Sequence, residues 1–250
     1  MGHQAVLATL RKGCTELELA AAVENAQRLA GHEGTFFMRL PDFFMGRGPL
    51  SSGPNLAEFS GVVLSVTGVG LSPAVPAGPS RRVIRKGDLV VVDIPTLVEG
   101  YHADQSRTYC VGKADNQIRD LYKNLKMIAD RVLANLAPGV KCSELFHLAM
   151  DQAAKLKVSD AFLNFGNNRK SHMVGHGVGL ECSEPPVISA TNHVELEENY
   201  VMALEIHMYR EKVGVVKLED MLLITHNGAE LLSKSPRQLL ELGAYASPRR

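Results

Sequence analysis

The stretch Val201–Ile224 reads VMALEIHMYREKVGVVKLEDMLLI, and its pattern predicts two strands joined by a turn. Its first half is an apolar run with a single carboxylate, Glu205, near the end. The polar segment Arg210–Gly214 is typical of a chain reversal. Counting back from that turn places Glu219 opposite Glu205. An ionised carboxylate in an apolar strand is costly unless a cation accompanies it, so the hairpin is expected to bind one.

An earlier stretch repeats this pattern. Leu89–Ile94, LVVVDI, is typical of a strand buried on both faces, with Asp93 near its end. A turn around Val98–Gly100 is expected to bring Asp104 opposite Asp93. Two cations could neutralise the repulsion between the two carboxylates, a shared metal ion or the guanidinium of Arg107. Because two hairpins each present an opposed carboxylate pair, the repetition favours the metal.

A glycine-rich stretch, Met173–Glu184 (MVGHGVGLECSE), supplies a histidine. The glycines around His176 would allow a ligand to approach closely, although a solvated histidine in a glycine-rich turn is the alternative. Four carboxylates and one histidine suit two divalent ions of the manganese, cobalt or zinc kind. Two such ions about 3.5–4 Å apart activate a bridging water near neutral pH, which predicts a hydrolase.

Composition excludes several classes of protein. Lys+Arg and Asp+Glu both number 27, so the net charge is +0. The chain as a whole therefore has no electrostatic attraction to nucleic acid or to an anionic membrane. No apolar run approaches the ~20 residues that span a bilayer. The four cysteines are scattered without a CxxC motif, and the N-terminus has no secretory signal pattern, so we expect a cytoplasmic protein with reduced thiols.

The remaining chain predicts mainly scaffold. One helix is expected to begin at the capping box Thr15–Glu18 and to end at Gly31. Three further helices are expected over residues 5–11, 116–137 and 143–156. Residues 34–87 are rich in Gly, Pro and Ser with interspersed Phe36, Phe37, Phe43, Phe44 and Met45, and are expected to form an ordered loop or a substrate-facing wall, with a strand over Gly61–Thr67.

These motifs resemble the pita-bread metallopeptidase family, which includes methionine aminopeptidase, aminopeptidase P and prolidase. The resemblance covers roughly residues 12–232 and rests on Gly87–Asp93, Asp104–Thr108, His172–Leu180, Glu205 and Glu219–Asp220. It implies an α+β fold with two pseudo-two-fold halves, a curved antiparallel sheet and helices on its outer face. It also implies one catalytic domain over residues 1–250, lacking the N-terminal domain of two-domain relatives, and a homodimer.

The resemblance assigns five metal ligands, Asp93, Asp104, His176, Glu205 and Glu219. It implies that Asp104 and Glu219 bridge two divalent ions (Mn, Co or Zn), while Asp93 chelates one ion, and His176 and Glu205 the other. A metal-bridging hydroxide would then attack the peptide carbonyl, with Glu205 as the proton shuttle.

The substrate class follows from the same resemblance. His172 matches a histidine that lies near the substrate in the proline-specific branch, which predicts an Xaa-Pro aminopeptidase or dipeptidase acting on peptides with proline at the second position. Two histidines usual in active members are absent, at Pro76 and Ser183. His207 is expected on the face opposite to Glu205, where it could not replace them. A non-peptidase amide or amidine hydrolase and a catalytically weak binding module are the alternatives.

Overall fold

The computed structural model describes residues 1–11, 13–36, 48–58, 65–167 and 169–242. Its helices are α1 (Gly2–Thr9), α2 (Glu16–Leu29), α3 (Asn116–Leu133) and α4 (Cys142–Lys155), with a 3-10 turn over Gly53–Ala57. The strands of the first half of the chain are β1 (Leu50–Ser52), β2 (Leu89–Asp93), β3 (Thr96–Val98), β4 (Tyr101–Ala103) and β5 (Ser106–Val111). Those of the second half are β6 (Asn164–Gly166), β7 (Arg169–Lys170), β8 (Met173–Gly177), β9 (Glu184–Ser189), β10 (Val201–Arg210), β11 (Gly214–Thr225), β12 (Gly228–Leu231) and β13 (Leu240–Leu242).

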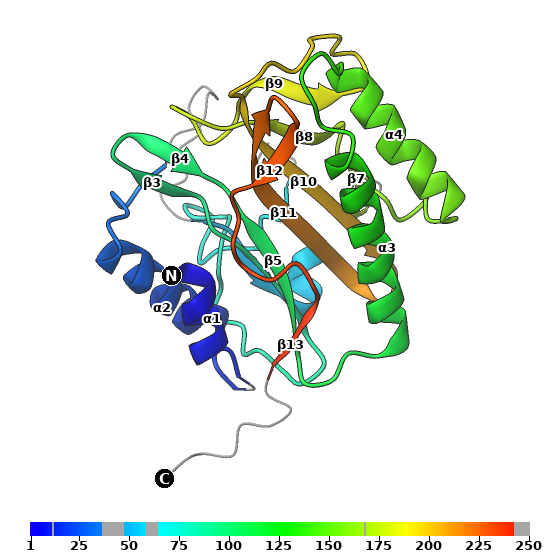
Figure 1. Ribbon diagram of the computed structural model, residues 1–250. Coiled ribbons are helices and arrows are strands. Elements are labelled where there is room, and N and C mark those ends of the chain that lie inside the picture. Colours follow the sequence, from blue (N-terminus) through cyan, green and yellow to red (C-terminus); the bar gives the residue numbers. More distant parts are fainter. Residues whose placement is uncertain (12, 37–47, 59–64, 168, 243–250) are drawn as a thin grey trace.

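Two larger sheets hold most of these strands (Figure 1). The first is built from the first half of the chain except for β13, and the second is built from the second half. The first has the order β1-β2-β5-β13, and the second has the order β12-β11-β10-β8-β9. Their pairs are antiparallel except for β13, which runs parallel to β5. Thr108 joins the two sheets, because its Oγ1 accepts from the Lys217 amide at 2.8 Å and donates to the Lys217 carbonyl at 2.7 Å.

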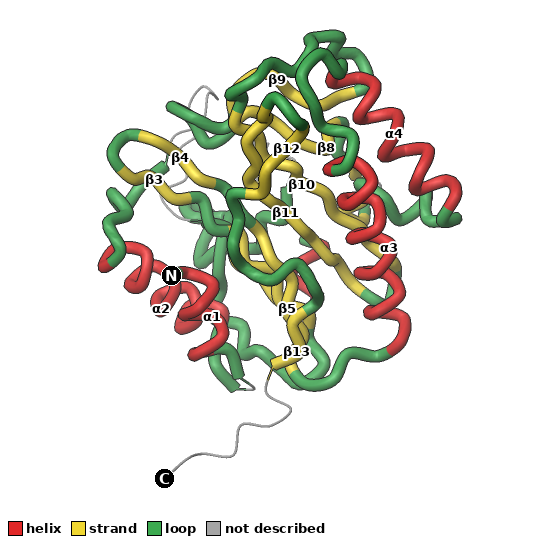
Figure 2. Tube along the Cα trace, viewed as in Figure 1, coloured by secondary structure: helices red, strands yellow, loops and turns green. Residues whose placement is uncertain are grey.

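Side-chain alternation along β10 and β11 separates the core from the site. Even-numbered residues such as Leu204, Ile206 and Leu218 are apolar and belong to the same buried cluster as the apolar faces of α3 and α4. Glu205 and Glu219 therefore project from the opposite face of the sheet. Figure 2 shows α3 and α4 beside the five-stranded sheet, and α1 and α2 beside the four-stranded one.

The first helix pair packs on its sheet through a second apolar cluster, which contains Val6, Leu19, Val90 and Val92. The capping box predicted at the start of α2 is confirmed, because the Thr15 hydroxyl accepts from the Glu18 amide and the Glu18 carboxylate accepts from the Thr15 amide.

Several element boundaries differ from those predicted. The first helix covers residues 2–9 instead of 5–11, and α3 ends at Leu133, before the predicted end at residue 137. Residues 61–64 of the predicted strand lie outside the described residues, and the described Ser65–Thr67 form no strand. The aromatic segment 37–45 also lies outside them, whereas Phe36 is buried. None of the described helices is long and apolar enough to cross a bilayer.

Candidate metal centre

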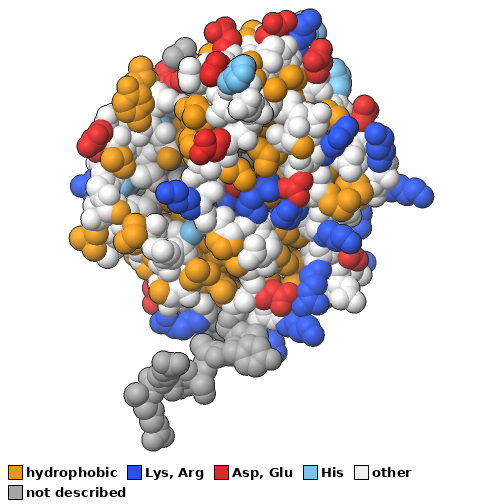
Figure 3. All heavy atoms as spheres, viewed as in Figure 1, with side chains coloured by type: hydrophobic (Ala, Val, Ile, Leu, Met, Phe, Trp, Pro, Cys, Tyr) orange, Lys and Arg blue, Asp and Glu red, His pale blue; other side chains and the backbone are white. Residues whose placement is uncertain are grey.

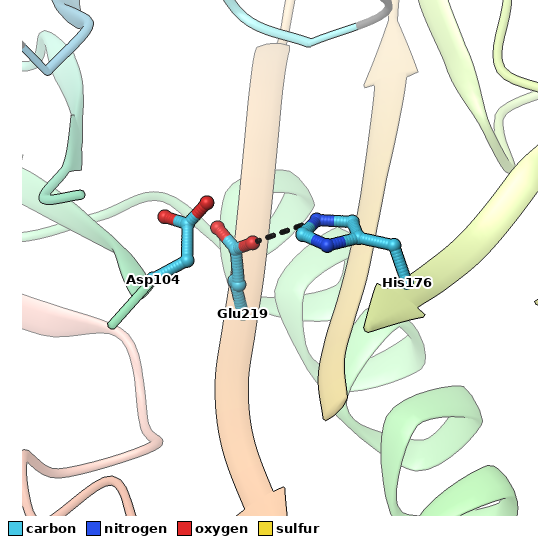
Figure 4. A group of neighbouring side chains, drawn as sticks. All are labelled: Asp104, His176 and Glu219. Atoms are coloured by element: carbon cyan, nitrogen blue, oxygen red, sulfur yellow. Dashed lines mark ion pairs between the residues drawn. The ribbon is translucent and has the colours of Figure 1, made fainter. Parts of the chain in front are cut away.

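The five predicted ligands converge where the two sheets meet, and all five are buried. Ligand atoms of Asp104, His176 and Glu219 lie within 4.8 Å of one another (Figure 4), and so do those of Asp93, Glu205 and Glu219. Glu219 belongs to both groups, and we call them the histidine group and the carboxylate group. Each contains residues from both halves of the chain, so the site depends on both sheets.

Three neighbouring strands position the second-half ligands. Glu205 and Glu219 are direct partners in the β10–β11 register, which confirms the predicted pair. His176 on β8 pairs with Ala203 on β10, so its imidazole reaches the same face. Its Nε2 lies 3.6 Å from Glu205 Oε2 and 3.9 Å from Glu219 Oε1.

The glycines beside His176 have a packing role that was not predicted from the sequence. A Cβ atom at Gly175 would lie 2.4 Å from the Ala203 carbonyl oxygen, and one at Gly177 would lie 2.6 Å from the Pro185 carbonyl oxygen. Both glycines therefore permit close packing of the backbone between strands.

The predicted register of the first hairpin is wrong by a small shift. Asp93 pairs with Ser106 instead of Asp104. The cause is the turn, because Glu99 and Gly100 both have positive φ, and the hairpin is centred between them. Asp104 lies in the irregular segment between β4 and β5, and reaches the site from there.

The alternative role for Arg107, as counter-ion of Asp93 and Asp104, is also wrong. Its fully buried guanidinium pairs with Asp220 at 2.6 Å and donates to the Glu219 carbonyl. The Ser106 hydroxyl donates to Glu219 Oε2 at 2.6 Å. Arg107 and its neighbour thus support Glu219 without neutralising the two aspartates.

Lys217 is the residue of this site that the sequence analysis missed. Its buried Nζ lies 2.5 Å from Asp93 Oδ2, 2.6 Å from Glu205 Oε1 and 3.3 Å from Glu219 Oε2. Burial lowers the pKa of Lys217, but these carboxylates raise it by more, so the net pKa lies well above its ordinary value. The same register that pairs Glu205 with Glu219 pairs Lys217 with His207, and this counting could have found it.

Buried atoms without partners indicate where a metal ion fits. Among the described residues, Asp104 Oδ1, Glu219 Oε1 and Asp93 Oδ1 are buried and have no hydrogen-bond partner. Such atoms are rare because an unpaired buried acceptor is costly. Two of them belong to the histidine group, which also offers an imidazole nitrogen. This group fits a divalent ion of the manganese, cobalt or zinc kind.

Proton binding in the histidine group reflects its crowded charge. Burial raises the pKa of Asp104 well above its ordinary value, and Glu219 and Asp93 raise it further. Burial and the neighbouring carboxylates likewise raise the pKa of Glu219 to about 8, although Lys217 opposes them. Burial lowers the pKa of His176, but Glu205 and Glu219 raise it by more. In the metal-free protein, the residues of the histidine group therefore bind protons near neutral pH.

The metal-free protein is expected to lose stability as the pH rises from about 7 to about 8. Glu219, Asp104 and His176 hold protons in the folded state that they release in the unfolded state, because their folded pKa values are raised. The unfolded state then binds fewer protons, so the free energy of unfolding falls, by roughly 1–3 kcal/mol. The pKa of both His3 and His207 is lowered to about 3 by burial, and their opposite contribution is nearly complete by pH 7.

Urea unfolding of chelator-treated protein across this pH range tests the expectation. Added Mn²⁺ should remove the loss, because the ion stabilises the deprotonated ligands, and Glu219→Gln should reduce it. A free energy of unfolding that is constant or rises over the range would contradict the proton assignment.

The other predicted histidines lie differently. His172 is exposed just before β8 and belongs to neither ligand group. His207 is buried and stacks on Phe165, with ring centroids 3.6 Å apart. The expectation that it faces away from Glu205 is wrong, because residues two apart in a regular strand share a face.

The segment around Ser183, where the resemblance expects a histidine, contacts the site. Cys182, adjacent to Ser183, donates from its Sγ to Asp104 Oδ2 at 3.0 Å. Burial raises the pKa of this thiol well above its usual value, and Asp104 raises it further, so the thiol stays protonated. Cys182 thus holds one oxygen of Asp104 and leaves the other free. All four cysteines are buried, and none of them forms a disulfide.

The fold and the site together define a pita-bread protein with a candidate metal centre. Residues 1–226 match metallopeptidase family M24, and the chain belongs to this family. The Xaa-Pro dipeptidase of Pyrococcus furiosus is 32% identical over 236 residues, which are 94% of this chain and 58% of that protein. The probable dipeptidase PepE of Mycobacterium tuberculosis is 28% identical over 239 residues, 95% of this chain and 55% of that protein.

Solved structures show the same likeness. The X-Pro aminopeptidase of Thermotoga maritima superposes with a TM-score of 0.78 at 25% identity, over 96% of this chain and 59% of that one. The prolidase of Pyrococcus furiosus gives a TM-score of 0.75 at 30% identity, over 94% and 60%. The chain thus spans less than two thirds of the length of these relatives.

Proposed function

We propose that this chain is the catalytic part of a metal-dependent peptidase that cleaves Xaa-Pro bonds. The observation that carries the proposal is the histidine group, Asp104, His176 and Glu219, which is buried and has two carboxylate oxygens without partners. Membership of a metallopeptidase family supports it, and so do relatives named Xaa-Pro dipeptidase. The substrate would be a small peptide with proline at the second position.

The histidine group would hold a divalent ion, manganese, cobalt or zinc. Such an ion polarises a carbonyl as a Lewis acid and lowers the pKa of a coordinated water. The protein fixes the ligands from outside, because Ser106 donates to Glu219 Oε2 and Cys182 donates to Asp104 Oδ2. These contacts orient the carboxylates toward a common point before an ion binds.

Glu205 would act as the proton shuttle. Burial raises its pKa, but Lys217 and His176 lower it by more, so Glu205 is ionised at neutral pH. The same two contacts make it a weak base, so it would accept a proton only transiently. Its Oε2 lies 3.6 Å from His176 Nε2, beside the proposed ion. His172 would orient the substrate from its exposed position before β8, where a peptide can reach it.

A second candidate is a non-peptidase hydrolase that acts on another small amide or amidine at the same site. The segment around Cys182 contacts Asp104, so its neighbour Ser183 lies close to the centre, where the resemblance expects a histidine. An imidazole that donates to a developing oxyanion is worth roughly 10²–10³-fold in rate, and its absence at this position favours a substrate other than a peptide or a slower reaction.

Hydrolysis of a panel of Xaa-Pro dipeptides and Xaa-Pro-Xaa tripeptides, with small amides and amidines alongside, separates the candidates. Manganese-loaded protein is expected to cleave the proline peptides, and Asp104→Asn, which keeps the size of the side chain, is expected not to. Cleavage of only the amides would favour the second candidate. Metal-loaded protein that cleaves neither class would contradict both.

The cytoplasmic location and the homodimer stay predictions. The face drawn in Figure 3 carries interspersed acidic and basic side chains, in line with the net charge of +0.

The prediction of two ions takes no account of Lys217, whose ammonium group lies among Asp93, Glu205 and Glu219.

A further inference from the structure

The carboxylate group already contains a cation. Lys217 Nζ contacts an oxygen of each member, Asp93, Glu205 and Glu219, at distances of 2.5, 2.6 and 3.3 Å. It also donates to Ser65 Oγ at 2.8 Å, and that hydroxyl donates in turn to Glu205 Oε1 at 3.0 Å. An ammonium group with three donors thus has all of its hydrogen bonds satisfied here.

The position of Nζ is the one that a metal ion of this group would need. A divalent ion is held where several carboxylate oxygens converge, at about 2.0–2.2 Å from each. Lys217 Nζ lies at the convergence of the same three carboxylates. An ion and the ammonium group cannot share that point, and two cations side by side in a buried site repel strongly.

The backbone of Lys217 is also fixed. Its amide and carbonyl are both bonded to Thr108 Oγ1, across the contact between the sheets. Its side chain is 1% exposed and shares the register of Glu219 on β11, which directs both side chains to the same face. The lysine is therefore built into the site, and does not reach it from the surface.

The histidine group offers the contrast. Asp104 Oδ1 and Glu219 Oε1 are buried without partners, and no lysine or arginine among the described residues is paired with Asp104 or with that oxygen of Glu219. Glu219 Oε2 thus lies 3.3 Å from the Lys217 ammonium group, whereas Glu219 Oε1 lies 3.9 Å from the His176 imidazole.

We propose that Lys217 is the resident cation of the carboxylate group, and that the chain holds a single divalent ion, at Asp104, His176 and Glu219. This inference deepens the proposed function, since it concerns the same centre, and it replaces the sequence-based expectation of two ions. Asp93 and Glu205 then act on the metal centre by holding Lys217 beside Glu219, instead of as ligands of a second ion.

Metal counting on the whole chain tests the inference directly. Protein equilibrated with excess Mn²⁺ and freed of unbound metal should retain one ion per chain by elemental analysis, with the electron paramagnetic resonance spectrum of isolated Mn²⁺. Lys217→Met removes the ammonium group and keeps a side chain of similar length. It should retain two ions per chain, with the altered spectrum of a spin-coupled pair.

The matched control is Lys126→Met, which removes a half-exposed lysine paired with Asp130 on α3. It should retain one ion, like the unaltered chain. Circular dichroism checks that each variant folds, and Lys217→Gln serves if Lys217→Met does not. Two ions or none in the unaltered chain would overturn the inference, and so would one ion in a folded Lys217 variant.

Peptide hydrolysis is scored separately, so that the two proposals fail in different ways. A chain that binds one ion and cleaves no proline peptide supports the single-ion inference and contradicts the proposed peptidase. A chain that binds two ions and cleaves the peptides does the reverse.

Discussion

Replacing His176 with alanine is expected to weaken Mn²⁺ binding by at least about 100-fold and to reduce peptidase activity to the level of metal-stripped protein. His176 would be the nitrogen ligand in the proposed centre, and its removal would leave Asp104 and Glu219 to hold the ion alone. Loss of a residue that merely orients a ligand typically costs 10–100-fold in affinity, so loss of a direct ligand should cost at least as much.

Competition with a chelator of known affinity measures the effect on binding. His147→Ala is the matched control, because His147 is an exposed histidine on α4, away from the site. It should bind Mn²⁺ as tightly as the unaltered chain. Retention of normal affinity by His176→Ala would show that the ion is held elsewhere.

Replacing Arg107 with methionine is expected to destabilise the fold by about 3–5 kcal/mol, because it leaves a buried charge network with one partner missing. The guanidinium pairs with Asp220 at 2.6 Å and donates to the carbonyl oxygens of Ser235 and Pro236 at 3.0 and 2.8 Å. After the substitution, Asp220 keeps only its second partner, Arg237. The two carbonyls lose their donor.

Arg119→Met is the control for this stability measurement. Arg119 pairs with Glu241 at 2.7 Å, but their side chains are 38% and 30% exposed, so its loss should cost less than about 1 kcal/mol. Urea unfolding of both variants gives the comparison. A cost for Arg107→Met as small as that for Arg119→Met would mean that the network contributes little to stability.

The two hairpins show what the sequence can and cannot predict. The Glu205–Glu219 pair follows from long strands with a polar turn between them, and its register is as predicted. The Asp93–Asp104 pairing is wrong because a short hairpin takes its register from the turn type, and the positive φ of Glu99 is not visible in residue types alone. Moving the centre of the hairpin by one residue shifts the pairing by two, from Asp104 to Ser106.

The missed residue has a different cause. Lys217 is two residues before Glu219, and strand alternation places both on one face. The same rule places His207 beside Glu205, contrary to expectation. A search limited to potential ligands passes over a lysine, because ammonium groups do not bind metals. That the ammonium contacts three carboxylates depends on how the sheets meet, and this follows from tertiary packing around Thr108.

The division of the five predicted ligands between the two sheets would link metal binding to folding. The β2–β5 sheet and its irregular segment supply Asp93 and Asp104, whereas β8, β10 and β11 supply His176, Glu205 and Glu219. Neither half of the chain contains the complete histidine group, so an ion at the proposed centre would bind tightly only after the halves have docked. An ion that binds after the rate-limiting step slows unfolding and leaves the folding rate unchanged. The metal centre would therefore extend the lifetime of the folded chain without helping it to form.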